Sequence, residues 1–503
     1  MFGRSDQNDG CPLQRAKVVG IRHLLVWMGS LMIGSVSLAF GDLPPGPQAN
    51  DASQTSGDDI LDAFLSQRSP LGVAPSTEST SIFYNMMPGS SVVFTSSDSM
   101  VVRSPTAAPP LSSLAQTSNQ LGVATVIDNA ISRWNLGSAN YIAREINSLP
   151  TLANRQAALN SLSGEVYGTL QSLGLQIGDR SLRIFSDRII NNDIFLNYGD
   201  AVLLSDRGNG TQTASDALVV RGQYSEQAFS GWVQGYGSGG GWDSNGNATA
   251  ADYRFGGIAY GIDLGRDETG EIGITGGNTF TTFDTDLQDH GRITSYQVGV
   301  YLVKRIDAAY LFSIFSYGRN NYSVNRQIQI GGFMDSPQSK LHGDSLSSYS
   351  ELGWNLDGPS IRFQPFLGLQ TLMLSNSRAN ESGAAGLNVA ASNLNSLRTH
   401  VGGRLIAPSL IDDLGIQWTP YMSARWVADL AGQSPDVSAS FNGGPAGASW
   451  TVTGVQSGRN FGLIGLGLTA QITDRLSLFA NYDYQTAARF HSHTGGGGLL
   501  FEF

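Results

Sequence analysis

The sequence predicts an all-β membrane protein: an antiparallel β-barrel of about twelve transmembrane strands, preceded by a helical segment and a low-complexity N-terminal region. Three observations lead to this fold class. From residue 229 onward, apolar and polar residues alternate with a period of two, in segments of 10 or more residues. Tilted strands need about 9–11 residues to cross a bilayer, whereas about 5–6 are commonest in soluble proteins. The apolar run 24–40 predicts export from the cytoplasm.

The composition agrees with a barrel and argues against several other classes. Only 14% of the residues are charged, and the mean hydropathy is −0.10. A barrel keeps its average hydropathy near neutral because only alternate residues face lipid. The net charge of −11 disfavours nucleic acid, whose phosphates need a basic surface. The sequence contains no Walker loop, Cys–His cluster or dinucleotide fingerprint, so we expect no cofactor and no metal.

Residues 1–41 are predicted to be a secretory signal peptide that engages the inner-membrane secretion machinery. Basic residues precede the apolar run 24–40, and Ala39 and Gly41 are small residues placed to form a cleavage site. The alternative is an N-terminal membrane anchor, although the run is short for a span of about 20 residues. The single cysteine, Cys11, precedes the run, so cleavage would leave a mature chain without cysteine.

Residues 42–120 are predicted to be a short low-complexity passenger or linker. Ser, Thr, Pro, Asp and Gly dominate there, as in "PPGPQANDASQTSGDD", and the apolar residues are too few for a core. The sequence shows no repeat with a period of about 20–50 residues, which would mark a solenoid. We therefore expect this segment to be mostly disordered.

Residues 121–228 are predicted to form a helical linker and a long helix that leads into the barrel. Val166, Leu170, Leu173 and Ile177 recur on one face of this helix. A basic side follows toward its C-terminal end, and it consists of Arg180, Arg183 and Arg188. An ordinary surface helix would show the same periodicity, so the pattern alone does not decide where the helix lies.

The barrel is predicted over 229–503. Its expected strands lie near 229–241, 251–265, 270–283, 291–305, 308–325, 340–357, 360–376, 393–407, 414–430, 460–473, 475–486 and 492–503. Aromatic residues gather toward strand ends, as at Trp354, Trp418 and Tyr482, and resemble the interfacial girdle of a membrane barrel. A soluble β-sandwich would show the same alternation. Strand length, the export signal and the aromatic residues favour the membrane.

The last strand ends both the barrel and the sequence, in "HTGGGGLLFEF". Leu499, Phe501 and Phe503 share one face, and Leu500 and Glu502 share the other. An open edge in lipid would leave backbone groups unpaired at several kcal/mol each, so the last strand must pair with the first. We therefore expect Leu499, Phe501 and Phe503 to face lipid.

The stretch from about 159 to 503 resembles the C-terminal translocator domain of bacterial autotransporters, the proteins of type V secretion. The resemblance rests on "LNSLSGEVYGTLQSLGLQ" (159–176), "GWVQGYGSGGGWDSN" (231–245), "YRFGGIAYGIDL" (253–264), "ASWTVTGVQSGRNFGLIGLGLTAQITDRLSLFANYDYQ" (448–485) and the final "FEF". It implies a twelve-stranded outer-membrane barrel plugged by an α-helix. It also implies a terminal aromatic signal, Phe501 and Phe503, that is read by the barrel-assembly machinery with periplasmic chaperones. Outer-membrane lipid is the remaining expected partner, and we expect a monomer.

A plug also follows from the size of the barrel. Eight-stranded barrels already fill with side chains and larger ones enclose channels, so a twelve-strand lumen needs filling. The helix 164–192 is long enough, since about 20 helical residues span roughly 30 Å. Its arginines would be costly to bury unpaired. We predict that they approach acids on the lumen face of the strands, for which the candidates are Asp263, Glu271, Glu351 and Asp483.

These inferences predict an autotransporter translocator that exports its own N-terminal segment or displays it on the cell surface, and that is not an enzyme. One alternative is a plugged pore or surface anchor without a secreted passenger. Another is an esterase, because "GDSL" occurs at 343–346 and offers Ser345 as a nucleophile. That motif lies within an expected strand, and no matching acid and histidine follow it.

Two further motifs have competing interpretations. Asn191 and Asn192, followed by an aspartate, resemble the site at which self-cleaving relatives cut, so passenger cleavage there is one hypothesis. The other interpretation is a helix C-terminal cap, because Asn tolerates the left-handed conformation. His491 and His493 share a strand face, but two ligands make a weak metal site.

Overall fold

The computed structural model describes the backbone of residues 92–93, 101–102, 109–134, 137–197, 201–203, 229–267, 269–358 and 361–503. The predicted signal peptide 1–41 lies outside these residues, as does most of the predicted passenger or linker 42–120. Within the latter segment, β1 (Val92–Val93) pairs antiparallel with β2 (Val101–Val102).

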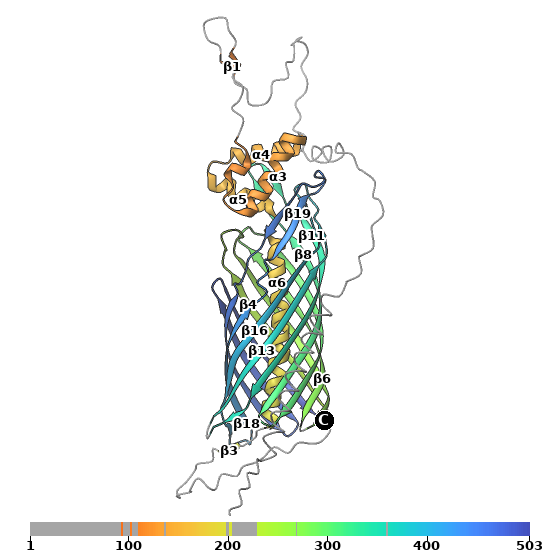
Figure 1. Cartoon of the computed structure of the whole chain (residues 1–503), viewed down its shortest axis with the longest axis vertical. Coiled ribbons are helices and arrows are strands. Elements are labelled where there is room, and N and C mark those ends of the chain that lie inside the picture. Colours follow the sequence, from red (N-terminus) through yellow and green to blue (C-terminus); the bar gives the residue numbers. More distant parts are fainter. Residues whose placement is uncertain are drawn as a thin grey trace, which may run out of the picture. The chain divides into compact units, whose positions relative to one another are not determined.

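Twelve long antiparallel strands form one closed barrel (Figure 1). They are β4 (Ser230–Trp242), β5 (Ala251–Asp267), β6 (Gly270–Thr285), β7 (His290–Ile306), β8 (Ala309–Asn325), β11 (Gln338–Trp354), β13 (Arg362–Asn376), β16 (Ser392–Ile406), β18 (Gln417–Asp429), β21 (Asn460–Thr473), β22 (Leu476–Ala487) and β23 (Phe490–Glu502). The shortest has 12 residues and the longest have 17, enough to cross a bilayer at a tilt. The fold class predicted from the alternation is confirmed.

The last strand closes the ring by pairing with the first. β23 and β4 are antiparallel, with Leu499 opposite Val233 and Phe501 opposite Gly231. Three short strands extend the same sheet beyond the ring: β3 (Ala201–Leu203), β12 (Leu356–Asp357) and β17 (Ser409–Ile411). Because each barrel strand has a partner on both sides, its backbone groups are satisfied without water.

The two ends of the barrel differ in their connections. One end has tight turns, such as 307–308 and 474–475, and the other has long loops with strands of their own. These are the hairpin of β9 (Ile328–Ile330) with β10 (Phe333–Asp335), and a four-stranded sheet of β14 (Ala379–Asn380), β15 (Leu387–Val389), β19 (Asp436–Phe441) and β20 (Ser449–Thr453). Outer-membrane barrels carry short periplasmic turns and longer extracellular loops, so the long-loop end is the extracellular mouth.

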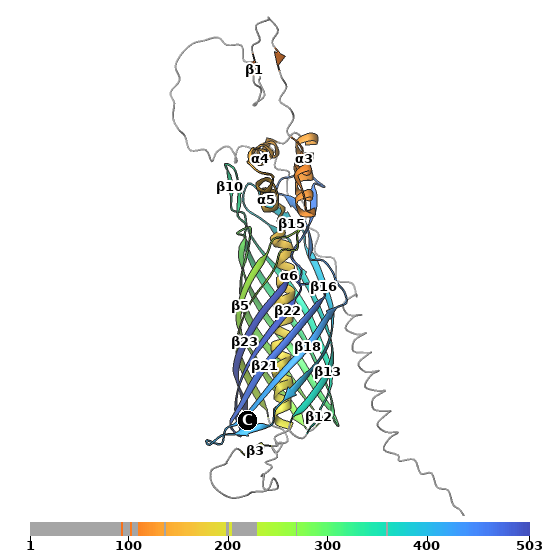
Figure 2. The same cartoon turned by 90° about the vertical axis from the view of Figure 1, so that its left-hand side faces the viewer.

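A helical cap lies at this mouth (Figure 2). It consists of η1 (Leu111–Leu114), α3 (Ser118–Trp134), α4 (Gly137–Ser148) and α5 (Leu152–Ser163). Trp450 of β20 donates its indole N–H to the Ser163 carbonyl at 2.9 Å, and the Asn119 side chain bonds the backbone of Thr453 in both directions at 2.9 Å. These bonds join the cap to the four-stranded sheet.

The long helix α6 (Glu165–Asn197) passes from the cap into the barrel lumen (Figure 1). Gly164 separates it from α5 and adopts a left-handed φ of 79°, a conformation that favours glycine. Apolar residues of α6 such as Leu170, Leu173 and Ile177 are at most 1% exposed. The predicted plug helix is therefore confirmed inside the barrel.

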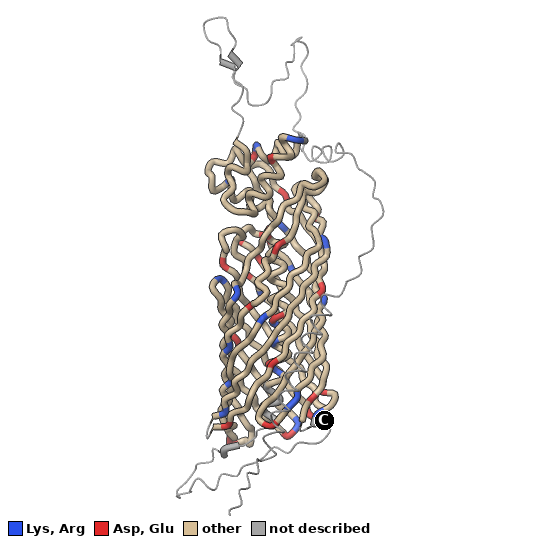
Figure 3. The backbone as a smooth tube through the Cα atoms, viewed as in Figure 1, with Lys and Arg blue, Asp and Glu red and all other residues tan. Residues whose placement is uncertain are grey.

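The two faces of the strands have opposite character. On β21, Leu466 is 53% exposed on the outer surface, whereas Thr469 is buried in the lumen. Charged residues are sparse along the barrel tube (Figure 3). Among the described residues, no helix is both long enough and apolar enough to span a membrane.

Candidate functional site: the filled lumen and its mouth

Asp179 on α6 stands at the centre of a buried charge network in the lumen. Its carboxylate lies 3.1 Å from the guanidinium of Arg183, one helical turn later, and 3.0 Å from that of Arg398 on β16. Gln370 of β13 donates a hydrogen bond to the same carboxylate at 3.1 Å. Two strands and the helix therefore share one carboxylate, which ties α6 to this side of the barrel wall.

The predicted basic side of α6 faces β22 and β23. Arg180 donates to the side chains of Gln485 at 3.2 Å and Ser492 at 2.9 Å. Arg183 donates to the same Gln485 oxygen at 2.7 Å. Asp483, one of the predicted partner acids, interacts electrostatically with both arginines. Their direct hydrogen bonds on β22 and β23, however, go to neutral side chains.

Arg188 lies deepest in the lumen among the three arginines. Its guanidinium stands 4.3 Å from the ring centroid of Phe479, a cation–π contact. It also interacts electrostatically with the predicted acids Asp263 and Glu271. A pocket beside it has a volume of about 10 Å³, which is room for about one water molecule.

Three of the four predicted acids have their direct partners on the barrel wall. Hydroxyl groups of Ser230 and Tyr301 donate to Asp263. Glu271 lies within 3.6 Å of Arg266 and 3.8 Å of Arg305. Glu351 of β11 pairs with Arg404 of β16 at 2.7 Å and accepts a hydrogen bond from Tyr310 at 2.5 Å. The structure brings no plug arginine into a salt bridge with Glu351.

The sequence reasoning missed several residues that hold α6 in place. Asp187 of α6 pairs with Arg425 of β18 at 2.8 Å, and Asp179 pairs with Arg398. A signal was present, because Arg398, Arg404 and Arg425 all occupy the lumen phase of their strands. These basic residues of the barrel strands were available as partners for the acidic residues of α6.

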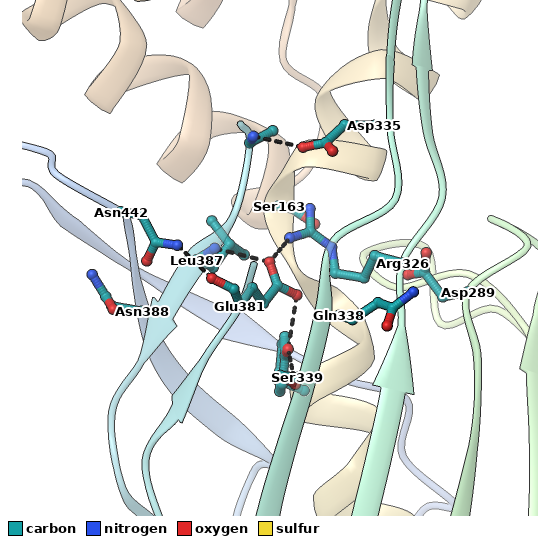
Figure 4. Close-up of polar contacts among 12 residues, drawn as sticks. Ser163, Asp289, Arg326, Asp335, Gln338, Ser339, Glu381, Leu387, Asn388 and Asn442 are labelled. Atoms are coloured by element: carbon teal, nitrogen blue, oxygen red, sulfur yellow. Dashed lines mark hydrogen bonds and ion pairs between the residues drawn. The ribbon is translucent and has the colours of Figure 1, made fainter. Parts of the chain in front are cut away.

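A second buried cluster, the mouth latch, lies where α6 enters the barrel (Figure 4). It consists of Tyr167, Arg326, Glu381, Ser339 and Ser161. Glu381 accepts from Tyr167 at 2.7 Å and from Arg326 at 2.6 Å, and its backbone lies in the β13–β16 loop. Arg326 also donates to the Ser161 carbonyl of α5 at 2.6 Å, and the Tyr167 hydroxyl lies 2.7 Å from that of Ser339. Both members of the Arg326–Glu381 pair have 0% exposed side chains.

Asp289 lies beside the latch in the turn between β6 and β7. Burial raises the pKa of its carboxyl to about 7, although the nearby Arg326 charge and a hydrogen bond from the Gln327 amide act in the opposite direction. Glu165 and Glu381 add like charges that raise this pKa further. The mouth therefore contains a titratable group within the physiological range of pH.

The other predicted motifs occupy clear positions. Ser345 of the "GDSL" stretch lies in the middle of β11, where its hydroxyl contacts the Gly318 carbonyl at 3.4 Å, so it does not form an esterase nucleophile turn. Asn191 and Asn192 lie inside α6 rather than at its end, and their side chains are outside the described part. His493 bonds the Tyr482 hydroxyl at 2.6 Å on the outer surface. No group of three potential metal ligands occurs among the described residues.

Phe501 and Phe503, the predicted assembly signal, both face outward at the periplasmic end. Their side chains are 40% and 79% exposed. The amide of Phe503 donates to the Phe229 carbonyl at 2.9 Å, beside the strand that closes the barrel. The terminal aromatic is thus presented on the lipid side of the seam between β23 and β4.

Comparison with known proteins identifies the family of the barrel. The model of the family described as "Autotransporter beta-domain" matches residues 231–483, slightly more than half of the 503 residues. The translocator domain of the autotransporter NalP from Neisseria meningitidis aligns with a TM-score of 0.51 and 19% identity, over 68% of this chain and 100% of that domain. The transport unit of AIDA-I from Escherichia coli aligns over 55% of this chain and 91% of that unit, with 19% identity and a TM-score of 0.42.

A curated relative gives a weaker match. An extracellular serine protease of Serratia marcescens is 24% identical over 179 residues. The match covers 36% of this chain but only 16% of the length of that protease. The family match and the barrel fold together support a translocator domain in the outer membrane, which is a transport module and not a catalytic one. The chain belongs to the autotransporter β-domain family.

Proposed function

We propose that this barrel carries its own N-terminal segment across the outer membrane and displays it at the cell surface. The direction of α6 carries the proposal. Glu165, its first residue, contacts Thr249 in the β4–β5 loop at the mouth, and the helix then descends toward the tight-turn end. The described segment 109–163, which precedes α6, joins the helix at this end, and this supports a route for the N-terminal segment through the barrel.

The docked cap favours display over release. Bonds from Asn119, Ser161 and Ser163 to the loops hold the cap on the mouth after α6 has filled the lumen. A cut at Asn191–Asn192 would sever the peptide inside the lumen but would leave these cap contacts in place. The N-terminal segment would then remain attached to the surface.

The topology can be tested by labelling cysteines in intact cells. We expect a single cysteine introduced as Ser132→Cys, on the exposed side of α3, to react with a membrane-impermeant maleimide. Cys11 would be replaced by Ser in every variant. A matched Asp474→Cys variant, in the exposed β21–β22 turn, should react only after the outer membrane is permeabilised. Labelling of Asp474→Cys alone in intact cells would invert the proposed orientation.

We also propose that Phe501 and Phe503 form the signal for the barrel-assembly machinery. Their exposure on the outer face leaves the rings available to a partner before lipid surrounds them. Deleting Phe503 should lower the amount of folded, heat-modifiable barrel in outer membranes, whereas Phe503→Trp should preserve it. Wild-type amounts after the deletion would rule out a role for this residue.

A further inference from the structure

A row of basic residues crosses the outer surface of the barrel toward the mouth. Arg254 of β5 stands opposite Thr282, which stands opposite Arg292 of β7. Arg292 in turn stands opposite Ser323, which pairs with Lys340 of β11. All three basic side chains are exposed on the outward face. Arg254, Arg292 and Lys340 are called the basic row below.

The basic row lies next to the apolar surface that faces lipid. On the same three strands, the side toward the periplasmic end carries Ile258, Val298 and Leu346, which are 50%, 57% and 49% exposed. Such outward apolar residues form the band of a membrane barrel, about 25 Å tall. The basic row follows this band on the side of the extracellular mouth. It therefore stands at the level of the headgroups of the outer leaflet.

Among the described residues, the cations of the row are not engaged with carboxylates. No ion pair of Arg254, Arg292 or Lys340 occurs in the part of the chain that the structure describes. By contrast, Arg319 on the same outer surface pairs with Asp344 at 2.8 Å. Asp252 and Asp284 lie one outward position nearer the loops, on the side away from the apolar band. On β5 and β6 the acids therefore lie on the loop side of the row, and on β11 the outward Asp344, on the lipid side, is already paired with Arg319.

The spacing of the row indicates what it fits. Neighbouring cations are two strands apart, which corresponds to roughly 9–10 Å at about 4.8 Å per strand. Because Arg and Lys side chains are long and flexible, two neighbouring cations can share one phosphate, and the whole row can contact more than one. Between the cations, the hydroxyl groups of Thr282 and Ser323 supply additional donors. A row of three cations over five strands suits a headgroup that carries more than one phosphate.

We propose that the basic row binds the phosphate groups of an anionic glycolipid in the outer leaflet. Charge complementarity and position both favour this partner over a soluble one, since the row borders the lipid-facing band. Binding there would fix the barrel laterally and in depth, beside the loops that carry the cap. The interaction involves no covalent step.

The proposal can be tested with the purified full-length protein in detergent. The probe is bisphosphorylated lipid A, compared with its dephosphorylated form, and the measurement is the dissociation constant at two salt concentrations. The variant Arg254→Gln/Arg292→Gln/Lys340→Gln should bind about 100-fold more weakly, because each cation near an anionic surface contributes roughly fivefold. Added salt should weaken binding by the wild type, since exposed charges are screened beyond about 8 Å at 0.15 M.

A matched variant removes the same charge elsewhere. Arg133→Gln/Lys304→Gln/Arg475→Gln alters exposed residues of the cap and of the periplasmic end, and its affinity should stay within about twofold of the wild type. The single variant Arg292→Gln, which should lose roughly fivefold, keeps the test available if the triple variant fails to fold. Equal affinity of the row and matched variants, or equal binding of dephosphorylated lipid, would overturn the proposal.

Discussion

The two halves of α6 contact the barrel in different ways. The upper half, 165–178, is held by close packing and by the neutral hydroxyl of Tyr167 in the mouth latch. A Cβ added at Gly168 would lie 2.4 Å from the backbone nitrogen of Gly454, so helix and loop touch through their main chains. The lower half, 179–190, is held by charges, chiefly Asp179 with Arg398 and Asp187 with Arg425.

This difference reflects what surrounds each half. At the mouth, loops and cap can adapt to the helix, so shape complementarity is available there. In the middle of the barrel the wall is a rigid ladder of backbone hydrogen bonds, and long side chains must bridge the gap to the helix. Buried charges need partners because an unpaired one is very costly in a low dielectric. Charge pairing therefore orients the lower half, and packing seals the upper half.

The largest expected effect comes from removing a charge of the lower half. Asp179→Ala leaves Arg183 and Arg398 without their shared carboxylate, which should cost about 3–5 kcal/mol in the free energy of unfolding. Thermal unfolding in detergent would measure it, and single-channel conductance should rise as α6 loosens. Asp179→Asn, of the same size, should lose almost as much. Unchanged stability of both variants would show that charge pairing does not hold the lower half.

A pH effect is expected at the mouth, from Asp289. Its folded pKa of about 7 lies above the ordinary value of 3.8, so the fold disfavours the ionised form. This destabilisation is absent below about pH 4, grows as pH rises and levels off above pH 7. In the middle of that window each pH unit corresponds to about 1.4 kcal/mol, and because the loss flattens near pH 7 it amounts to roughly 2 kcal/mol between pH 5 and pH 7.

Hydrogen exchange of the β6–β7 turn and of the Gln327 amide would measure the destabilisation caused by ionised Asp289. Protection should decrease from pH 5 to pH 7 beyond the intrinsic rate change. Asp289→Asn, which cannot ionise, should remove the additional decrease. The exchange protection of the amides around Asp179 should not depend on pH in either the wild type or Asp289→Asn. An equal pH-dependent loss of protection around Asp179 would show that the two halves of α6 do not differ in this respect.

The packing of the upper half can be tested with one methyl group placed at two positions. Gly168→Ala forces the helix away from Gly454 and should cost about 1–3 kcal/mol. The control Gly178→Ala lies in the same helix, but the nearest atom to its Cβ, Cδ2 of Leu372, is 3.5 Å away. It should be neutral or slightly stabilising, because Ala favours a helix. The comparison would fail if both substitutions changed the unfolding temperature equally.

The smallest effect is expected from the hydroxyl group in the latch. Tyr167→Phe removes a hydrogen bond to the charged Glu381, worth about 1.5–3 kcal/mol, but leaves that carboxylate with Arg326 and the Leu387 amide. A net loss of about 1 kcal/mol in the free energy of unfolding is therefore expected. Stability and the accessibility of cap cysteines to maleimide would measure it. If Tyr167→Phe lowered the free energy of unfolding as much as Asp179→Ala, contacts at the mouth would be as important for holding α6 as the charge pairs in the lumen.

The sequence by itself determined the strands, their faces and the helical character of α6. Alternation with a period of two separated outward Leu466 from inward Thr469, and the length of the segments favoured a bilayer over a soluble sandwich. Closure followed because lipid cannot satisfy an open edge, and the β23–β4 pairing confirms it. The apolar face of α6 was visible from helical spacing alone. Alternation, segment length and helical spacing are local signals, because each can be read from one segment of the sequence without its partners.

Tertiary structure alone decided the partners. Asp179 meets Arg398, and Tyr167 meets Glu381, only because the barrel register and the depth of α6 bring distant residues together. Periodicity shows that Glu351 faces the lumen but not that Arg404, two strands away, reaches it before any plug arginine. The docking of the cap was beyond sequence reasoning for the same reason, since Gly122 of α3 and Ser163 of α5 contact Trp450 of the distant β20. Side-chain pairing depends on relative position in three dimensions, and no local period encodes it.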